Sequence, residues 1–464
     1  MPAWDTLRNL VKEEFAQSVQ EGRDADAVNA LRAEYEAAET DEAKLHAVWE
    51  KMLALPIRTD FPFNEPSDLV GIQALRPNAP HSYKLELSDE ALYEKMYGAW
   101  LGRCAGCALG KPIEGFMGEH NGLSSKERIK TYLTAISPDE YPIRDYFPQH
   151  SPAEEQTGKV GCYPSTREEI AFMESDDDIR YTVLGQIVMR DKGRSFTTRD
   201  VAGAWIGRLP YGMVCTAETQ AYRNLVNRYH FHVSGDKDDV IDWNWVATYQ
   251  NPYREWIGAQ IRADSWGYAA PGNMELAAEF AYRDARLSHV KNGIYGEMFV
   301  AAMISAAYVL NDPRAIVAAG LAEIPQTSRL YTEMQQTLEI CTKYDDDPAK
   351  FEAVLEEIYA ILGHYHPVHT NNNAALVVAA LVLGGHDLDK VITIAVMGGW
   401  DTDCNGATAG SIAGTMLGAK ALPDKWIGRL NDTLNSQIIG YHPIAISECA
   451  NRSVEIARKT LGDE

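Results

Sequence analysis

Hydrophobic positions recur at helical spacing along most of the chain, which predicts a protein built almost entirely from α-helices. Strict alternation of apolar and polar residues, which is typical of half-buried strands, is scarce. The pattern therefore favours an all-α fold. The predicted helices of the main body span residues 176–191, 198–207, 274–286, 294–310, 330–342, 351–363, 373–383, 388–397 and 404–419.

The first part of the chain has a different character. Residues 1 to about 55 have the pattern of two or three polar helices, and residues 56–87 are rich in Pro, Asn and Asp, which is typical of an extended linker. Ser88 is a good N-cap for the next helix. We therefore divide the chain into an N-terminal helical extension with its linker, residues 1–87, and a helical domain, residues 88–464. We expect the extension to pack on this domain or on a second subunit; a partner-binding arm is the alternative.

Two sets of glycines recur at every fourth position, which places each set on one ridge of a helix. Glycine inside a helix costs about 1 kcal/mol relative to alanine. Close approach of a neighbouring helix or a ligand would offset that cost. We predict tightly packed helices around a site, with a glycine-tolerant loop at 106–110 as the alternative. The two sets are Gly98, Gly102, Gly106 and Gly110, and Gly406, Gly410, Gly414 and Gly418.

Two acidic clusters precede predicted helices. The first is Glu174-Ser175-Asp176-Asp177-Asp178, and the second is Asp401-Thr402-Asp403. Capping of a helix N-terminus would explain either cluster alone. Three consecutive aspartates, however, repel one another and exceed what one cap can use. Their oxygens suit Mg²⁺, Mn²⁺ or Ca²⁺, and residues 398–419 contain no Lys or Arg to balance the second cluster. The clusters therefore predict a metal site.

Three motifs resemble those of the ADP-ribosylglycohydrolases, of the dinitrogenase-reductase-activating type. They are Gly106-Cys107-Ala108-Leu109-Gly110-Lys111-Pro112-Ile113-Glu114, Ser175-Asp176-Asp177 and Gly399-Trp400-Asp401-Thr402-Asp403-Cys404-Asn405. The resemblance covers roughly residues 90–425. It implies an orthogonal multi-helix bundle that holds two Mg²⁺ or Mn²⁺ ions. It also implies an enzyme that cleaves the glycosidic bond between the anomeric carbon of ADP-ribose and a protein side chain or small acceptor.

By the same resemblance, the expected metal ligands are Ser175, Asp176, Asp177, Asp401 and Asp403. Glu114 is the expected acid or base, and the metal-bound carboxylate of Asp177 is expected to share that role. The chain departs from the family pattern at four positions. Asp178 stands where threonine is more frequent, Cys107 replaces an aspartate, Cys404 replaces a hydroxyl residue, and Trp400 is inserted. A thiol is a poor ligand for a hard cation, so these changes bear on the substrate more than on the metals.

Further residues are candidate substrate contacts. Residues 261–273 have the pattern of an aromatic, glycine-containing loop; the resemblance places ligand contact there, and a structural turn is the alternative. His289 follows a predicted helix, where a favourable cap is the alternative. His369 and Asn372 precede another predicted helix and could line the substrate pocket. Cys104 and Cys107 form a lone C-x-x-C, which indicates a buried helical face rather than zinc or redox chemistry. The candidates are Trp266, Gly267, His289, His369, Asn372 and Cys404.

The composition narrows the possible partners. The formal net charge of −23 disfavours duplex nucleic acid as a partner. No stretch of about 20 apolar residues predicts a membrane span. The first residues lack the pattern of a signal peptide, and seven scattered cysteines suit a reducing compartment. We therefore expect a cytoplasmic protein that acts on a small-molecule or ADP-ribosylated substrate.

Together these features predict a hydrolase that uses two divalent cations, Mg²⁺ first and Mn²⁺ or Ca²⁺ next, to cleave the anomeric bond of ADP-ribosyl conjugates. Two alternatives remain open. One is an N- or O-glycosidase that acts on a small nucleoside-like metabolite. The other is a non-catalytic protein that binds an ADP-ribose-like ligand; the full set of oxygen ligands argues against it.

Overall fold

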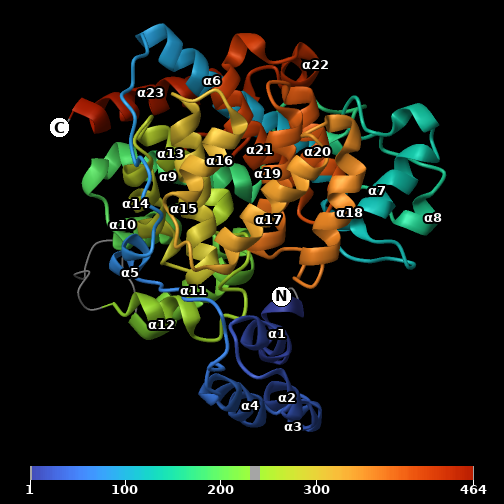
Figure 1. Ribbon diagram of the computed structural model, residues 1–464, viewed down its shortest axis with the longest axis vertical. Helices are drawn as coiled ribbons and strands as arrows, with labels where there is room; N and C mark the ends of the chain where they lie inside the picture. Colours follow the sequence, from blue (N-terminus) through green and yellow to red (C-terminus); the bar gives the residue numbers. More distant parts are fainter. Residues whose placement is uncertain (1–2, 230–240, 463–464) are drawn as a thin grey trace.

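The computed structural model describes residues 3–229 and 241–462, and within them the fold is all-α (Figure 1). Regular strands in this part of the chain are limited to β1 (Thr433–Leu434) and β2 (Ile444–Ala445), which pair antiparallel with Thr433 opposite Ala445. The α-helices of the extension and linker are α1 (Leu7–Gln20), α2 (Ala25–Ala30), α3 (Arg32–Ala38), α4 (Glu42–Ala54) and α5 (Leu69–Ala74). Those of the body are α6 (Asp89–Gly110), α7 (Ser125–Thr134), α8 (Glu154–Thr157), α9 (Asp177–Lys192), α10 (Thr198–Arg208), α11 (Thr216–Tyr229), α12 (Trp243–Thr248), α13 (Asp264–Ala269), α14 (Met274–Ala285), α15 (Lys291–Ala307), α16 (Pro313–Leu321), α17 (Arg329–Lys343), α18 (Phe351–Leu362), α19 (Thr370–Gly384), α20 (Leu388–Met397), α21 (Thr402–Leu417), α22 (Asp424–Ile427) and α23 (Ile446–Gly462).

The nine helices predicted for the body are all present, within a few residues of the predicted ends. Ser88 caps α6 as expected, because its hydroxyl accepts a hydrogen bond from the backbone N–H of Ala91. The loop predicted for residues 261–273 is wrong in its middle, where α13 forms. That short helix exists because Trp266 and Tyr268 are buried in the core, so tertiary packing overrides the local glycine and proline signals.

The two glycine ridges pack against each other, which confirms the close approach of a neighbouring helix that was predicted for each ridge. Along α6 and α21, a Cβ on Gly98, Gly102 or Gly106 would collide with a backbone carbonyl oxygen of the facing glycine on α21. Gly110 continues the contact, because it faces the carbonyl of Thr402. Residues 106–110 are therefore helical and not a loop. The last glycine of the second set, Gly418, lies beyond the end of α21 and takes a positive φ of 81°.

The hydrophobic core of the body surrounds α15 and α19. Every residue of α19 is buried, and the helix carries no charged side chain. Figure 1 shows these helices in yellow and orange at the centre of the molecule, with α17 and α18 beside them. The body therefore gives a rigid support to the helix ends that the acidic clusters occupy.

The extension packs on the body, which is one of the two arrangements expected for it. Helices α1, α3 and α4 enclose a small apolar core around Phe15 and Trp49, and Tyr253 and Trp256 of the body belong to the same cluster. Figure 1 shows these helices in blue below α11. The linker then runs along the body, where its Glu65 forms a buried ion pair with Arg329.

Candidate active site

A cleft of about 770 Å³ opens where the C-terminal end of α6 meets the N-terminal ends of α9 and α21. The close packing of the two glycine ridges sets this geometry, because it places the start of α21 beside the residues that follow α6. The charged side chains that line the cleft are Glu13, Lys111, Glu114, Asp177, Arg180, Glu218, Asp401 and Asp403.

The two acidic clusters meet in this cleft. Asp176 caps α9 by accepting a hydrogen bond from the backbone N–H of Asp178 at 3.0 Å, and Asp177 opens the helix. Asp401 occupies the N-cap position of α21, and Asp403 lies in its first turn. Segments more than 200 residues apart therefore present Asp177, Asp401 and Asp403 to one cavity.

Lys111 brings a positive charge into the centre of these acids. Its ammonium nitrogen lies 2.6 Å from Asp176 Oδ2, 2.9 Å from Glu114 Oε2 and 3.4 Å from Asp403 Oδ2. The sequence argument had found no base near the second cluster along the chain, and the counter-charge comes instead from the end of the first glycine motif. The ion pair of Lys111 with Glu114 is thus one part of a larger cluster.

Burial and mutual repulsion disturb the ionisation of the carboxyls. Burial raises the pKa of Asp177 to about 6, and the neighbouring Asp176 adds to the shift. Burial also raises the pKa of Asp401 to about 7, with a further contribution from Glu114. Burial opposes the charge of Asp176 as well, but Lys111 overcomes this effect and lowers its pKa to about 2. Lys111 and Arg180 are fewer than the six carboxylates that line the cleft, so an excess of negative charge remains, which a cation would relieve.

The donor set fits a hard divalent cation. Asp403 Oδ1 is buried with no hydrogen-bond donor among the described residues, and ligand atoms of Asp178, Asp403 and Cys404 lie within 4.8 Å of one another. A thiol suits Mg²⁺ poorly, and both oxygens of Asp178 have other partners, so Asp403 is the donor of this group that remains for a cation. Ser175 Oγ accepts a hydrogen bond from Arg180 at 2.8 Å. As a metal ligand, this oxygen would accept the hydrogen bond and bind the ion at the same time.

Asp178 has a different role from its neighbours. Its carboxylate is fully buried and faces the guanidinium of Arg103, with Nη2 at 3.3 Å from Oδ1. Arg103 also donates to the backbone carbonyl of Asp178 at 2.7 Å. The thiol of Cys404 donates to the other carboxylate oxygen, at 3.2 Å. These contacts fix the start of α9 against α6 and α21, and they occupy both oxygens of Asp178.

Of the six candidate substrate contacts, Cys404 lines the cleft. Trp266 lies in the core and stacks on Phe196 with 4.8 Å between ring centroids. Gly267 packs against Ile304 of α15. Neither residue belongs to the set that lines the cleft, and a contact with substrate stays a prediction for them.

The remaining candidates, His289, His369 and Asn372, are also buried outside the set that lines the cleft. His289 Nδ1 lies 2.8 Å from the hydroxyl of Ser288. His369 caps α19, because its ring accepts a hydrogen bond from the N–H of Asn371 at 3.1 Å. Asn372 donates to the backbone carbonyl of His366 at 3.2 Å. These three residues support the cleft wall, and their contact with substrate stays a prediction.

The sequence argument missed the outer wall of the cleft. Trp4, Asn9 and Glu13 of the extension line it, together with body residues Tyr253 and Trp256. The aromatic stretch from Trp243 to Trp256 was the available signal, and it was equally consistent with core packing. Nothing in the local sequence pairs the extension with this stretch, because the two are about 240 positions apart.

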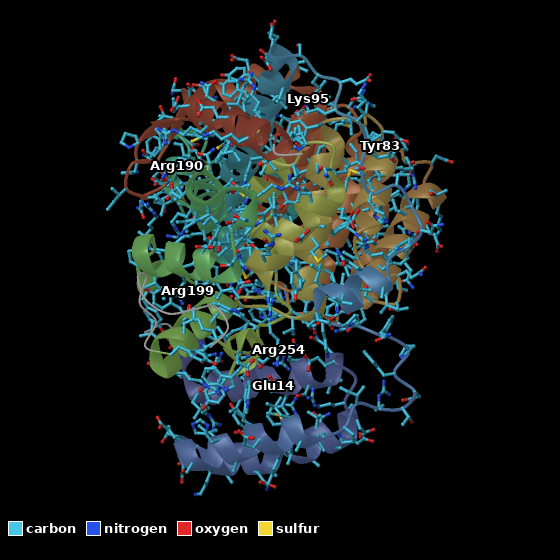
Figure 2. All side chains as sticks on the ribbon, turned by 90° about the vertical axis from the view of Figure 1, so that its left-hand side faces the viewer. Glu14, Tyr83, Lys95, Arg190, Arg199 and Arg254 are labelled. Carbon is cyan, nitrogen blue, oxygen red and sulfur yellow. The ribbon has the colours of Figure 1, made fainter. Side chains whose placement is uncertain are left out.

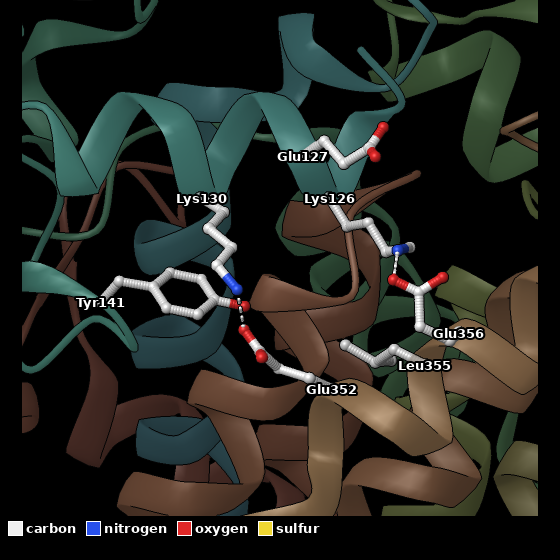
Figure 3. Close-up of a pocket in the computed structure, with 7 residues that line it drawn as sticks. All are labelled: Lys126, Glu127, Lys130, Tyr141, Glu352, Leu355 and Glu356. Atoms are coloured by element: carbon white, nitrogen blue, oxygen red, sulfur yellow. Dashed lines mark hydrogen bonds and ion pairs between the residues drawn. The ribbon is translucent and has the colours of Figure 1, made fainter.

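A second hollow, of about 230 Å³, lies between α7 and α18 (Figure 3). Two of its three glutamates are paired with lysines: Lys126 pairs with Glu356 at 2.5 Å, and Lys130 pairs with Glu352 at 2.6 Å. Such pairs contribute about 0–1 kcal/mol. The third, Glu127, accepts hydrogen bonds from Ser124. The excess negative charge of this hollow is therefore smaller than that of the first cleft, and the first cleft is the candidate active site.

Comparison with known proteins identifies the class. The sequence model of the family "ADP-ribosylglycohydrolase" matches residues 88–455. The chain belongs to this family and is an all-α glycosidase, which confirms the resemblance seen in its motifs. The match begins at Ser88, so the N-terminal extension lies outside it.

Among solved structures, the chain is similar to an "ADP-ribosylglycohydrolase-related protein complex". The two chains share 16% sequence identity, and the alignment covers 80% of this chain and 99% of the other, with a TM-score of 0.47. No sequence among the curated proteins matches the chain. In the part of the chain that the structure describes, none of the helices has the length and apolar character needed to cross a membrane.

Proposed function

We propose that the protein is a glycosidase that depends on two divalent cations and cleaves the anomeric bond of ADP-ribosyl conjugates. The observation that carries the proposal is the convergence of Asp177, Asp401 and Asp403 on one cleft, beside Glu114. Helix capping alone does not require the N-termini of two helices to face each other. The combined negative charge of these carboxylates also exceeds the positive charge of Lys111.

The cations would be held by Ser175 and the four aspartates Asp176, Asp177, Asp401 and Asp403, with Mg²⁺ as the first candidate and Mn²⁺ or Ca²⁺ next. When bound, such ions supply positive charge that orients ribosyl hydroxyls and a water molecule and stabilises charge at the reacting centre. The buried, donor-free Oδ1 of Asp403 supports this assignment.

The remaining chemistry belongs to the side chains of the protein. Hydrolysis adds water to the anomeric carbon, breaks its bond to the acceptor and delivers a proton to the leaving atom. Glu114 lines the cleft with 39% of its side chain exposed, so it can reach both a water and a leaving group. Its carboxylate takes the proton from the water or passes one to the acceptor. Lys111 keeps Glu114 close to Asp403, and Asp177 is the second candidate for proton transfer.

A second candidate function is the hydrolysis of a small riboside without a diphosphate. The charge of the cleft favours it, because its described lining contains six carboxylates and two bases. Lys111 contacts three carboxylates and Arg180 donates to Ser175 Oγ, so both bases already have partners. Diphosphates are usually bound by free Arg or Lys side chains and by helix N-termini.

Metal binding tests the proposal directly. We expect calorimetric titration and elemental analysis to give two divalent cations per chain, and chelation to abolish activity and lower the Tm. Asp177→Asn and Asp403→Asn should each reduce activity or metal affinity by at least about 100-fold, since each removes a ligand charge. The exposed Asp345→Asn is the matched control. Failure to bind Mg²⁺, Mn²⁺ or Ca²⁺ at millimolar concentration would contradict the proposal.

A further inference from the structure

Part of the wall of the cleft comes from the N-terminal extension. Trp4 and Asn9 line the same cavity as Asp177 and Asp401. Trp4 lies just before α1, and Asn9 lies in its first turn. A segment outside the family-matched residues 88–455 therefore forms part of the active-site cleft.

The extension is fixed at this position by four consecutive residues of the body. The hydroxyl of Tyr253 donates to the carbonyl of Trp4 at 2.6 Å, and the amide of Asn9 donates to that hydroxyl at 3.1 Å. Gln17 donates to Glu255 at 2.7 Å. Trp256 belongs to the apolar cluster of the extension. The segment that holds the extension is thus also a wall of the cleft.

Arg254, the remaining residue of this segment, forms buried ion pairs with the extension. Its guanidinium is buried and bonds both Glu14 of α1 and Glu21, the residue that follows α1. Its Nη1 lies 2.6 Å from Glu14 Oε2, and its Nε lies 2.9 Å from Glu21 Oε1. Figure 2 shows Arg254 facing Glu14 at the boundary between the body and the extension. Breaking a buried pair leaves an uncompensated charge and is strongly destabilising. The extension is therefore a permanent part of the cleft and not a loosely attached arm.

The surface that the two parts make is aromatic. Trp256 stacks on His366 with 4.0 Å between centroids and 12° between planes, and Tyr253 lies 4.5 Å from Trp256. Trp4 meets Tyr253 edge-on at 6.4 Å. Flat rings with polar edges are well suited to contact another flat ring. A volume of about 770 Å³ is also within the usual range for small ligands, about 300–1,000 Å³.

We propose that the extension forms the substrate-selecting wall of the cleft, where Trp4, supported by the buried rings of Tyr253 and Trp256, contacts the flat group of a small, free substrate. This inference rests on the proposed function, in which the acids of the same cleft hold the ribosyl group through the cations. A substrate attached to a protein would have to bring a macromolecular surface to a rim that the extension already occupies. The substrate class is therefore a free ribosyl compound with a planar ring.

The first test measures binding and does not depend on turnover. Adenosine, which pairs a ribosyl group with a flat base, is titrated into wild type, Trp4→Ala and Trp4→Phe. Loss of one stacked ring costs roughly 1–3 kcal/mol per base, so Trp4→Ala should weaken binding about tenfold, and Trp4→Phe should restore most of it. The matched control is Arg8→Ala on the same helix, whose guanidinium contacts Glu36 and the Tyr35 ring and not the cleft.

The second test compares rates. Wild type should hydrolyse a small ADP-ribose conjugate of an amino acid with a kcat/KM well above that for an ADP-ribosylated protein, and Trp4→Ala should raise KM more than it lowers kcat. Equal adenosine affinity in wild type and Trp4→Ala, or equal kcat/KM for the free and protein-bound substrates, would overturn the inference. If no ribosyl compound is hydrolysed with any divalent cation, the proposed function fails, and the adenosine titration still decides the role of the wall.

Discussion

The ammonium group of Lys111 lies where three carboxylates converge, so it competes with a divalent cation for Asp176 and Asp403. Two unit charges 4 Å apart interact by up to about 4 kcal/mol at an effective dielectric constant of 20. Removing the lysine charge should therefore strengthen cation binding. Lys111→Met is expected to raise the affinity for Mg²⁺ or Mn²⁺ at least about tenfold in calorimetric titration at fixed pH.

Lys126→Met is the control for this prediction, because Lys126 is paired with Glu356 in the second hollow and faces no candidate metal ligand. Its cation affinity should equal that of wild type. Unchanged or weaker binding in Lys111→Met would show that the lysine holds the carboxylates in place and does not compete for them.

Glu114 is the residue on which the chemical step depends in the proposed function. Glu114→Gln keeps the size and hydrogen-bonding capacity of the side chain but loses the ionisable group. We expect kcat to fall by about 10² to 10⁴, the range for general acid–base catalysis, with metal content unchanged. If the only role of Glu114 were its partly exposed ion pair with Lys111, the substitution would lower the free energy of unfolding by about 0–1 kcal/mol.

Kinetics of the Glu114→Gln variant on ADP-ribosylated peptides, ADP-ribose esters and simple ribosides decide between these two roles. Unchanged kcat on the best substrate would remove Glu114 from the mechanism. Hydrolysis of ribosides alone, by wild type, would favour the second candidate function over the first.

At the scale of elements, the contact between α6 and α21 determines whether the two acidic clusters share one site. Gly106→Ala would place a methyl group against the backbone carbonyl of Gly406, which has no rotamer by which to move away. Overpacking of this kind costs about 1–3 kcal/mol and occasionally more. We expect a loss near 3 kcal/mol in the free energy of unfolding, measured with denaturant, and lower metal affinity because the helix ends separate.

Gly203→Ala offers a matched control, because Gly203 lies within α10 and a Cβ there would meet no atom within 4 Å. Alanine is the better helix former by about 1 kcal/mol, so this variant should be neutral or more stable. A Gly106→Ala variant as stable as wild type would mean that the ridges separate without cost.

The sequence was informative where a local pattern carries the physical constraint. Glycines at every fourth position predicted that another helix would approach each ridge closely, and acids at two helix starts predicted a metal site. Contacts between distant segments left no such pattern. Asn9 and Tyr253, 244 positions apart, share a hydrogen bond that neither residue signals alone. Lys111 is similar, since its role depends on where Asp176 and Asp403 lie in space.

At the scale of the whole molecule, we predict that the stability of the fold depends on pH through His369. Its fully buried ring caps α19 in the neutral form, by accepting the N–H of Asn371. Burial, aided by Arg329 and opposed by Glu255, lowers its pKa from 6.5 to about 3. Between these two values the unfolded chain binds a proton that the folded chain does not. This contribution to stability is complete above pH 6.5 and is lost as the pH falls toward 3.

The variant His369→Asn isolates that contribution, because asparagine is a good N-cap and does not titrate. Wild type should lose stability relative to the variant as the pH falls from 6.5 to 4, with a slope of up to about 1.4 kcal/mol per pH unit. Denaturant unfolding of both proteins across this pH range measures the difference in their free energy of unfolding. Groups that titrate equally in the two proteins cancel in that difference. A difference that stays constant with pH would mean that His369 already carries a proton in the folded protein, and its ring nitrogen would then not be the acceptor that caps α19.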